Sequence, residues 1–172
     1  MPHRLRTVSL AAAFTVLAAT PALAGPPWIS IELPANPYDA ATRGAFLVVH
    51  AFHHGTPVSF PVEGTAEGLV NGERRSIKLE FTRTGQDGAY ALRKQWSSEG
   101  TWTLVIRVVQ GEQGGGESGA ATALVEVGSD GDVASVKVPT HRQGEWTIPS
   151  SVSMSDVDAG LRARAALLAG RS

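Results

Sequence analysis

The sequence from residue 102 to 109 reads WTLVIRVV, and its apolar side chains recur at every second position. Trp102, Leu104, Ile106 and Val108 therefore share one face of an extended chain, whereas a helix would spread them around its circumference. Burial of a large aromatic side chain stabilises a fold, so we expect Trp102, and with it Trp96, to be core residues. The stretch predicts a β-strand with one face in a hydrophobic core.

Seven further runs of the same kind predict strands on either side of this one. They cover residues 28–33, 45–52, 62–70, 76–83, 90–96, 121–127 and 133–138. The run 45–52 (AFLVVHAF) is apolar on both faces, which is typical of a central strand. In the run 76–83, Ile77, Leu79 and Phe81 point one way. Asn71-Gly72 and Asp130-Gly131 are strong signals for tight hairpin turns, and the pattern as a whole predicts an all-β sandwich.

Two segments interrupt or follow this pattern. Residues 111–119 (GEQGGGESG) cannot bury enough surface to offset their chain entropy, which predicts a mobile hairpin loop. Residues 140–153 are polar and irregular, and a short C-terminal α-helix is predicted after them, with Ser155 as its N-cap. Its apolar stripe would be Val157, Leu161, Ala165 and Leu168. This helix either lies back on the sandwich or docks on another protein.

The first 24 residues have the pattern of a cleavable signal peptide. Arg4 and Arg6 supply a basic start, residues 10–19 an apolar stretch, and 22–24 (ALA) a small-residue cleavage site before Gly25. We therefore expect a signal peptide at 1–24, a β-sandwich at 25–138 and a tail with a short helix at 139–172. The mature protein would be periplasmic or secreted, with no membrane span after cleavage.

Composition excludes several classes of function. The sequence has no cysteine, which removes disulfides, lipid attachment and thiol chemistry. Without Arg4 and Arg6, 13 basic residues stand against 16 acidic ones, a formal charge of −3 that argues against a nucleic-acid partner. Neither G-x-S-x-G, S-x-x-K nor H-E-x-x-H occurs, so we expect a protein that is not an enzyme and has no cofactor. Glu63 and Glu67 could face the same side, as part of a solvated face.

Three histidines, His50, His53 and His54, stand together at the end of the apolar strand 45–52. Neutral imidazole is a ligand for copper, nickel and zinc. His50 and His54 share side-chain parity on an extended strand, whereas His53 points the other way unless the chain turns, as Gly55 and Pro57 would permit. The histidines are either metal ligands for copper or zinc, or ordinary polar residues at a strand end.

The expected amino terminus of the mature chain is Gly25-Pro26-Pro27. It cannot form the tight amino-terminal copper site that uses deprotonated amides and a third-position histidine, because proline has no amide proton. A different kind of ligand, a sugar, could stack on an exposed Trp28, Trp96 or Trp146.

Four motifs carry a resemblance to a known group of domains: 46–52 (FLVVHAF), 62–64 (VEG) running to the Asn71-Gly72 turn, 88–92 (GAYAL) and 100–104 (GTWTL). On these, residues 46–109 resemble the small extracytoplasmic immunoglobulin-type domains grouped as YtkA-like or carboxypeptidase regulatory-like. The resemblance implies an immunoglobulin-like β-sandwich of about seven to eight strands. Some YtkA-like domains are associated with copper handling. Residues 87–92 are also similar to a tyrosine corner, which implies a structural role for Tyr90.

The sequence thus predicts an exported, non-enzymatic β-sandwich module for binding or assembly in the bacterial cell envelope, with an envelope protein as partner. The alternative is a periplasmic metal-binding accessory protein that holds copper or zinc through His50, His53 and His54.

Overall fold

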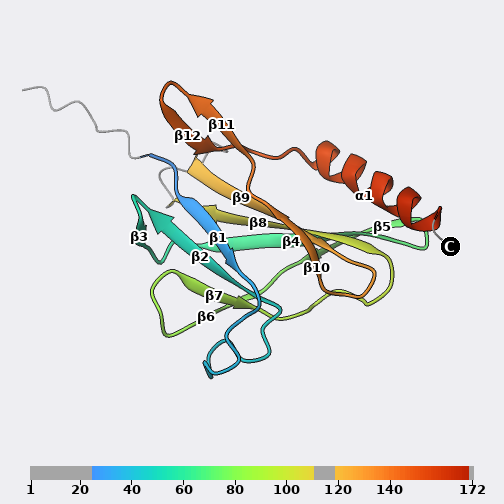
Figure 1. Ribbon diagram of the computed structural model, residues 1–172, viewed down its shortest axis with the longest axis horizontal. Helices are drawn as coiled ribbons and strands as arrows, with labels where there is room; N and C mark the ends of the chain where they lie inside the picture. Colours follow the sequence, from blue (N-terminus) through green and yellow to red (C-terminus); the bar gives the residue numbers. More distant parts are fainter. Residues whose placement is uncertain (1–24, 111–118, 171–172) are drawn as a thin grey trace, which may run out of the picture.

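The structure is a computed structural model that describes residues 25–110 and 119–170 (Figure 1). The expected signal peptide at 1–24 and almost all of the expected loop at 111–119 lie outside these ranges. Within them, no helix is long and apolar enough to cross a membrane.

Two antiparallel sheets make up most of the molecule. The first sheet follows the order β1 (Trp28–Glu32), β2 (Leu47–His53), β7 (Ala89–Leu92) and β6 (Phe81–Arg83), with the short β3 (Thr56–Pro57) also paired with β2. The second sheet follows the order β10 (Val133–Lys137), β9 (Ala120–Val127), β8 (Thr101–Val109), β4 (Val62–Val70) and β5 (Glu73–Lys78). A separate hairpin of β11 (Thr140–Gln143) and β12 (Trp146–Pro149) stands near the N-terminal end of β1 (Figure 1).

The core lies between the two sheets, as the alternating pattern predicts. Trp102, Leu104, Ile106 and Val108 on β8 are all buried in it, and they meet Leu47, Val49 and Ala51 from β2. Strand β2 is central, between β1 and β7, and Val48 on its other face is buried as well. The prediction of an all-β protein with antiparallel sheets and a C-terminal helix is confirmed.

Gly64 and Gly68 interrupt the pattern of 62–70 and weaken its prediction as a strand. β4 nevertheless spans all nine of these residues, and in the sheet it lies between β8 and β5. Gly68 lies opposite Trp102 in the ladder, and a Cβ atom on Gly68 would stand 2.5 Å from the indole ring. The missing side chain makes room for the tryptophan, so this glycine is part of the core packing.

The single strand predicted for 76–83 is wrong, because the chain changes sheet in its middle. β5 ends at Lys78 in the second sheet and β6 begins at Phe81 in the first. Ile77, Leu79 and Phe81 nevertheless all pack against the same core. Both sheets face one core, so the alternation of apolar residues continues unbroken through the crossing and does not reveal it.

The strand predicted for 90–96 is shorter than expected. β7 ends at Leu92, and Trp96 lies in the following loop, buried with its ring 4.9 Å from that of Phe46, edge to face. Tyr90 is buried too, and its hydroxyl donates to the carbonyl of Phe60 at 2.6 Å. Its role is structural as expected, but the bond reaches 30 residues upstream to another segment, which differs from a tyrosine corner.

The C-terminal helix α1 (Met154–Ala169) lies on the outer face of the second sheet. Val157 and Leu161 are buried there against Val105 of β8, so the helix packs on its own sandwich. Its N-cap is Ser153, whose hydroxyl accepts from the amide of Asp156. The prediction of Ser155 as the cap is wrong by two residues, and the irregular segment expected before the helix contains the β11–β12 hairpin.

Candidate functional site

The most distinctive surface lies where β1 begins and β2 ends, and we call it the hairpin corner. It comprises Gly25, Trp28, 52–57, and the neighbouring His50 and Glu32. Residues Phe52 and His53 pair with Pro57 and Thr56, so His54 and Gly55 alone form the turn between β2 and β3. Both turn residues have positive φ, 50° at His54 and 77° at Gly55, as two-residue hairpin turns prefer. The turn that the sequence permits after His53 does form.

This turn brings His53 and His54 against the start of the described chain. Their ring centroids are 4.2 Å apart, and Nε2 of His53 lies 3.0 Å from the carbonyl oxygen of Gly25. A methyl group on Gly25 would stand 3.8 Å from Cε1 of His54. Both imidazoles therefore flank Gly25, a neighbour 28 residues earlier in the sequence that strand pattern alone does not point to.

His50 has a different environment from the other two histidines. Its Nε2 lies 2.8 Å from a carboxylate oxygen of Glu32 on β1, and its ring stacks with that of Phe52 at 6.3 Å between centroids. In the part of the chain that the structure describes, no three or more His, Cys, Asp or Glu side chains form a group that could hold a metal ion. The structure brings together His53 and His54, while His50 pairs with Glu32.

An apolar row crosses the outer face of the first sheet at the hairpin corner. Trp28 of β1 lies opposite Phe52 of β2, which lies opposite Pro57 of β3. Directly opposed residues in an antiparallel ladder project to the same face. Their neighbours Ile29 and Ala51 are buried in the core, so this row faces away from it. Trp28 is 40% exposed, and Pro57 is exposed.

The other tryptophans separate into core and surface. Trp96 and Trp102 are buried as predicted, and the indole of Trp102 donates to the carbonyl of Glu99 at 2.8 Å. Because Trp96 is buried, its ring cannot stack on a sugar. Trp146, by contrast, is 76% exposed on the β11–β12 hairpin.

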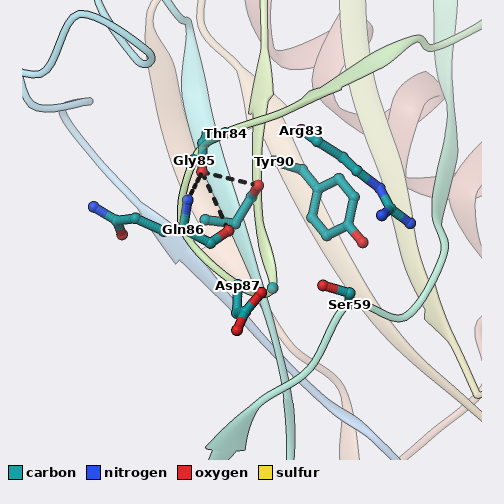
Figure 2. Close-up of a pocket in the computed structure, with 9 residues that line it drawn as sticks. Ser59, Arg83, Thr84, Gly85, Gln86, Asp87 and Tyr90 are labelled. Atoms are coloured by element: carbon teal, nitrogen blue, oxygen red, sulfur yellow. Dashed lines mark hydrogen bonds between the residues drawn. The ribbon is translucent and has the colours of Figure 1, made fainter.

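A small open hollow of about 130 Å³ lies at the turn between β6 and β7 (Figure 2). Its polar lining includes Ser59, Arg83, Asp87 and Tyr90, with the guanidinium carbon of Arg83 5.7 Å from the centre of the Tyr90 ring. The hydroxyl of Thr84 accepts from the amide of Gln86 and donates to the carbonyl of Ala89, which holds the turn closed. None of the lining residues is a histidine or lysine that could act as a base for Ser59. We attribute the hollow to the shape of this turn.

Charged side chains also meet beneath helix α1, and they include Glu67, which the sequence predicts on a solvated face. Glu67 is only 3% exposed; it accepts from Arg74 at 2.7 Å and from the hydroxyl of Ser76 at 2.9 Å. Arg74 also reaches Asp158 of the helix at 2.7 Å. Burial lowers the pKa of Arg74, but hydrogen bonds and attraction from the two carboxylates outweigh it and raise the pKa above its ordinary value. Glu63 pairs separately with Arg107 at 3.4 Å.

A second cation, the half-buried Arg164, fixes the other end of the helix. Arg164 donates to the carbonyls of Trp102 and Val127 and to the hydroxyl of Thr103, at 2.7 to 3.2 Å. Burial lowers the pKa of Arg164, and attraction from the carboxylate of Glu126 offsets part of that effect. The guanidinium nevertheless stays charged at every accessible pH. Glu67, Arg74, Asp158 and Arg164 thus hold the helix in place, and their roles are structural.

Comparison with known proteins gives no relative: no family model, no curated protein and no solved structure matches this chain.

Proposed function

We propose that this chain is an exported, non-enzymatic sandwich of the immunoglobulin type that serves as a binding or assembly module in the bacterial cell envelope, periplasmic or secreted. The strand order supports the immunoglobulin type. The path β1-β2-β7-β6 corresponds to strands A-B-E-D, and β9-β8-β4-β5 corresponds to G-F-C-C′. The resemblance to YtkA-like or carboxypeptidase regulatory-like domains belongs to the same proposal.

The observation that carries the binding role is the apolar row Trp28, Phe52 and Pro57. Three apolar side chains lie side by side across three strands on an outer face, with a 40% exposed tryptophan at one end. Tryptophan is enriched at the centre of protein interfaces, because it buries a large apolar area and keeps an N–H for a hydrogen bond. An envelope protein with an apolar side chain to place on this row is the partner we propose.

A photo-crosslinking amino acid at position 28 tests this role in the bacterium that exports the protein. We expect one discrete adduct with an envelope protein, lost when Phe52 is changed to Ala. The control position is Tyr38, which is 91% exposed on the loop between β1 and β2. Adducts of equal yield at positions 28 and 38 would mean that exposure alone explains the contact, and the apolar row would then have no binding role.

Leu161 of helix α1 cannot serve as a probe of partner binding. A Leu161→Asp variant would test partner docking only if the Leu161 side chain were accessible. Leu161 is 1% exposed, on the side of the helix that packs on the sheet. Such a variant would detach α1 from the sheet, so positions on the outer face of the first sheet are the better probes.

The second candidate function is metal binding, as a periplasmic accessory protein for copper or zinc. The specific observation in its favour is the pair of imidazoles at His53 and His54, 4.2 Å apart. His50 belongs to this candidate only if its ring leaves Glu32. Titration of the triple histidine-to-alanine variant with copper(II) and zinc tests it, and binding equal to that of the parent chain would refute it.

A further inference from the structure

Gly25 lies against the two adjacent histidines of the hairpin corner, and it is also the residue at which the mature chain would begin. This coincidence rests on the proposed export, with cleavage between Ala24 and Gly25. Cleavage there converts the peptide nitrogen of Gly25 into an α-amino group. We propose that this cleavage completes a copper(II) site formed by the α-amino nitrogen and carbonyl oxygen of Gly25 together with the imidazoles of His53 and His54.

The distances fit ligands that share one metal ion. Two donors at metal–ligand distances of 2.0 to 2.1 Å on adjacent square positions stand about 2.9 Å apart. Nε2 of His53 and the carbonyl oxygen of Gly25 are 3.0 Å apart. Two imidazoles on adjacent positions of one metal have ring centroids about 4.5 Å apart, by the same bond lengths. The centroids of His53 and His54 are 4.2 Å apart.

The backbone holds these groups in place before any metal arrives. The ladder between β1 and β2 pairs Trp28 with Phe52, which sets Gly25 three residues before β1 and beside the end of β2. His54 is fixed in a two-residue turn at φ 50°. The ligands therefore lose little freedom on binding, a condition that strengthens a site.

The residue after Gly25 decides the kind of chelate. Pro26 has no amide proton, so a metal at this terminus cannot bind a deprotonated amide nitrogen of the next residue. The amine and carbonyl oxygen of Gly25 then remain as a five-membered chelate, once the ammonium has released its proton to water. Three nitrogens and one oxygen suit copper(II), which prefers tetragonal N and O ligands and binds most tightly in the divalent series.

The test compares two forms of the protein that differ by one residue. One begins at Gly25, and the other carries one additional alanine before Gly25; both are prepared by protease removal of a fusion partner. The extension leaves all histidines in place, moves the amine one residue away and turns the nitrogen of Gly25 into a peptide nitrogen. Isothermal titration with copper(II) should show one site in the first form. We expect an affinity lower by more than about 100-fold in the extended form, because even partners outside the ligand shell contribute ten- to a hundredfold.

Histidine variants of the form that begins at Gly25 complete the design. His53→Ala and His54→Ala should each weaken copper binding to a similar degree, whereas His50→Ala should leave it unchanged, because His50 pairs with Glu32. Electron paramagnetic resonance with 15N-labelled glycine should show altered nitrogen coupling from the amine. Tryptophan fluorescence, to which the buried Trp96 and Trp102 contribute, reports whether each variant is folded, and the extended form serves as the folded comparison if a histidine variant is not.

Each result separates this inference from the proposals on which it depends. Equal affinity in the two forms would overturn the amine site and leave export and partner binding intact. An equal loss in His50→Ala would replace it with the three-histidine site. A mass spectrum of the exported protein that begins elsewhere than Gly25 would overturn it as well, while export itself would stand.

Discussion

At the residue scale, Gly68 makes room for the indole of its ladder partner Trp102 in the core. The indole occupies the space that a β-carbon on Gly68 would need, 2.5 Å from the ring. The indole of Trp102 cannot move aside easily, because the ring is rigid and buried in the core between the two sheets. The smallest possible addition at this position therefore disturbs the core.

Gly68→Ala should lower the free energy of unfolding by about 1 to 3 kcal/mol, the usual effect of overpacking a well-filled core. Gly160→Ala is the matched control, since Gly160 lies in helix α1 with nothing within 4 Å of an added methyl group. That change should stabilise the protein by about 0.5 to 1 kcal/mol through helix propensity. Urea denaturation measures both, and equal effects of the two substitutions would contradict the packing role of Gly68.

Glu126 gives the protein a pH dependence that can be assigned to one residue. Burial raises the pKa of its carboxyl, but a hydrogen bond from Ser135 and attraction from Arg164 and Lys137 outweigh burial and lower the pKa below its ordinary value of 4.5. The charged form is thus favoured more in the folded protein than in the unfolded chain. Glu126 therefore contributes stability above about pH 4.5, and this contribution is lost as the pH falls through the lower, folded-state value.

Glu126→Gln should be less stable than the parent chain at pH 7, with a difference that shrinks as the pH falls below 4.5. Thermal unfolding across a pH series measures the difference. A difference that stays constant down to the most acidic pH would show that Glu126 has no favourable partner in the folded state.

At the scale of the element, helix α1 depends on polar contacts as much as on apolar ones. Only Val157 and Leu161 are buried in it, whereas Arg164 and Asp158 bond to the sheet beneath. The N-cap hydroxyl of Ser153 begins the helix before its apolar residues reach the sheet. A helix with two buried residues is marginal alone, so the charged contacts decide whether it stays docked.

Arg164→Ala should destabilise the protein by about 1 to 3 kcal/mol, because it removes four charge-assisted hydrogen bonds and leaves two carbonyls without this donor. Hydrogen exchange in α1 should accelerate more than exchange in β8. Arg162→Ala, on the exposed side of the same helix, should change stability by less than about 0.5 kcal/mol. A helix that exchanges equally in the two variants would show that Val157 and Leu161 suffice for docking.

At the scale of the whole molecule, the two sheets depend on each other through one core. The chain passes between them at Leu79, and side chains of β2, β8 and β9 meet in the same cluster. Neither sheet can bury its inner face without the other. The β11–β12 hairpin lies outside this arrangement, since its strands pair only with each other.

Hydrogen exchange should accordingly divide the chain into two levels of protection. Amides of β8 and β9, which have a strand on each side, should exchange only through global unfolding, whereas those of β11 and β12 should exchange by local opening. Mass spectrometry of peptides from each segment gives the rates. Protection of β11–β12 equal to that of β8 would mean that the hairpin belongs to the cooperative unit.

Local sequence determined those features that depend on neighbours along the chain. Alternation identified the face of β8 that enters the core, because side chains in a strand point to opposite faces in turn. Asn71-Gly72 fixed a hairpin turn, since both of its residues take positive φ, 52° and 81°. Of the predicted stripe Val157, Leu161, Ala165 and Leu168, the first two lie on the face that α1 buries, whereas Leu168 is 37% exposed. These are local preferences, so they can be predicted from a few adjacent residues.

Tertiary structure alone decided which distant residues meet. The change of sheet between Lys78 and Phe81 has no local signal, because both sheets share one core. The burial of Glu67 follows from a helix that begins some 90 residues later and supplies Asp158 to its partner Arg74. The approach of Gly25 to His53 follows from the pairing of β1 with β2. Such contacts depend on how the elements pack. The sequence of a strand does not by itself specify which residues, distant in the chain, will lie against it.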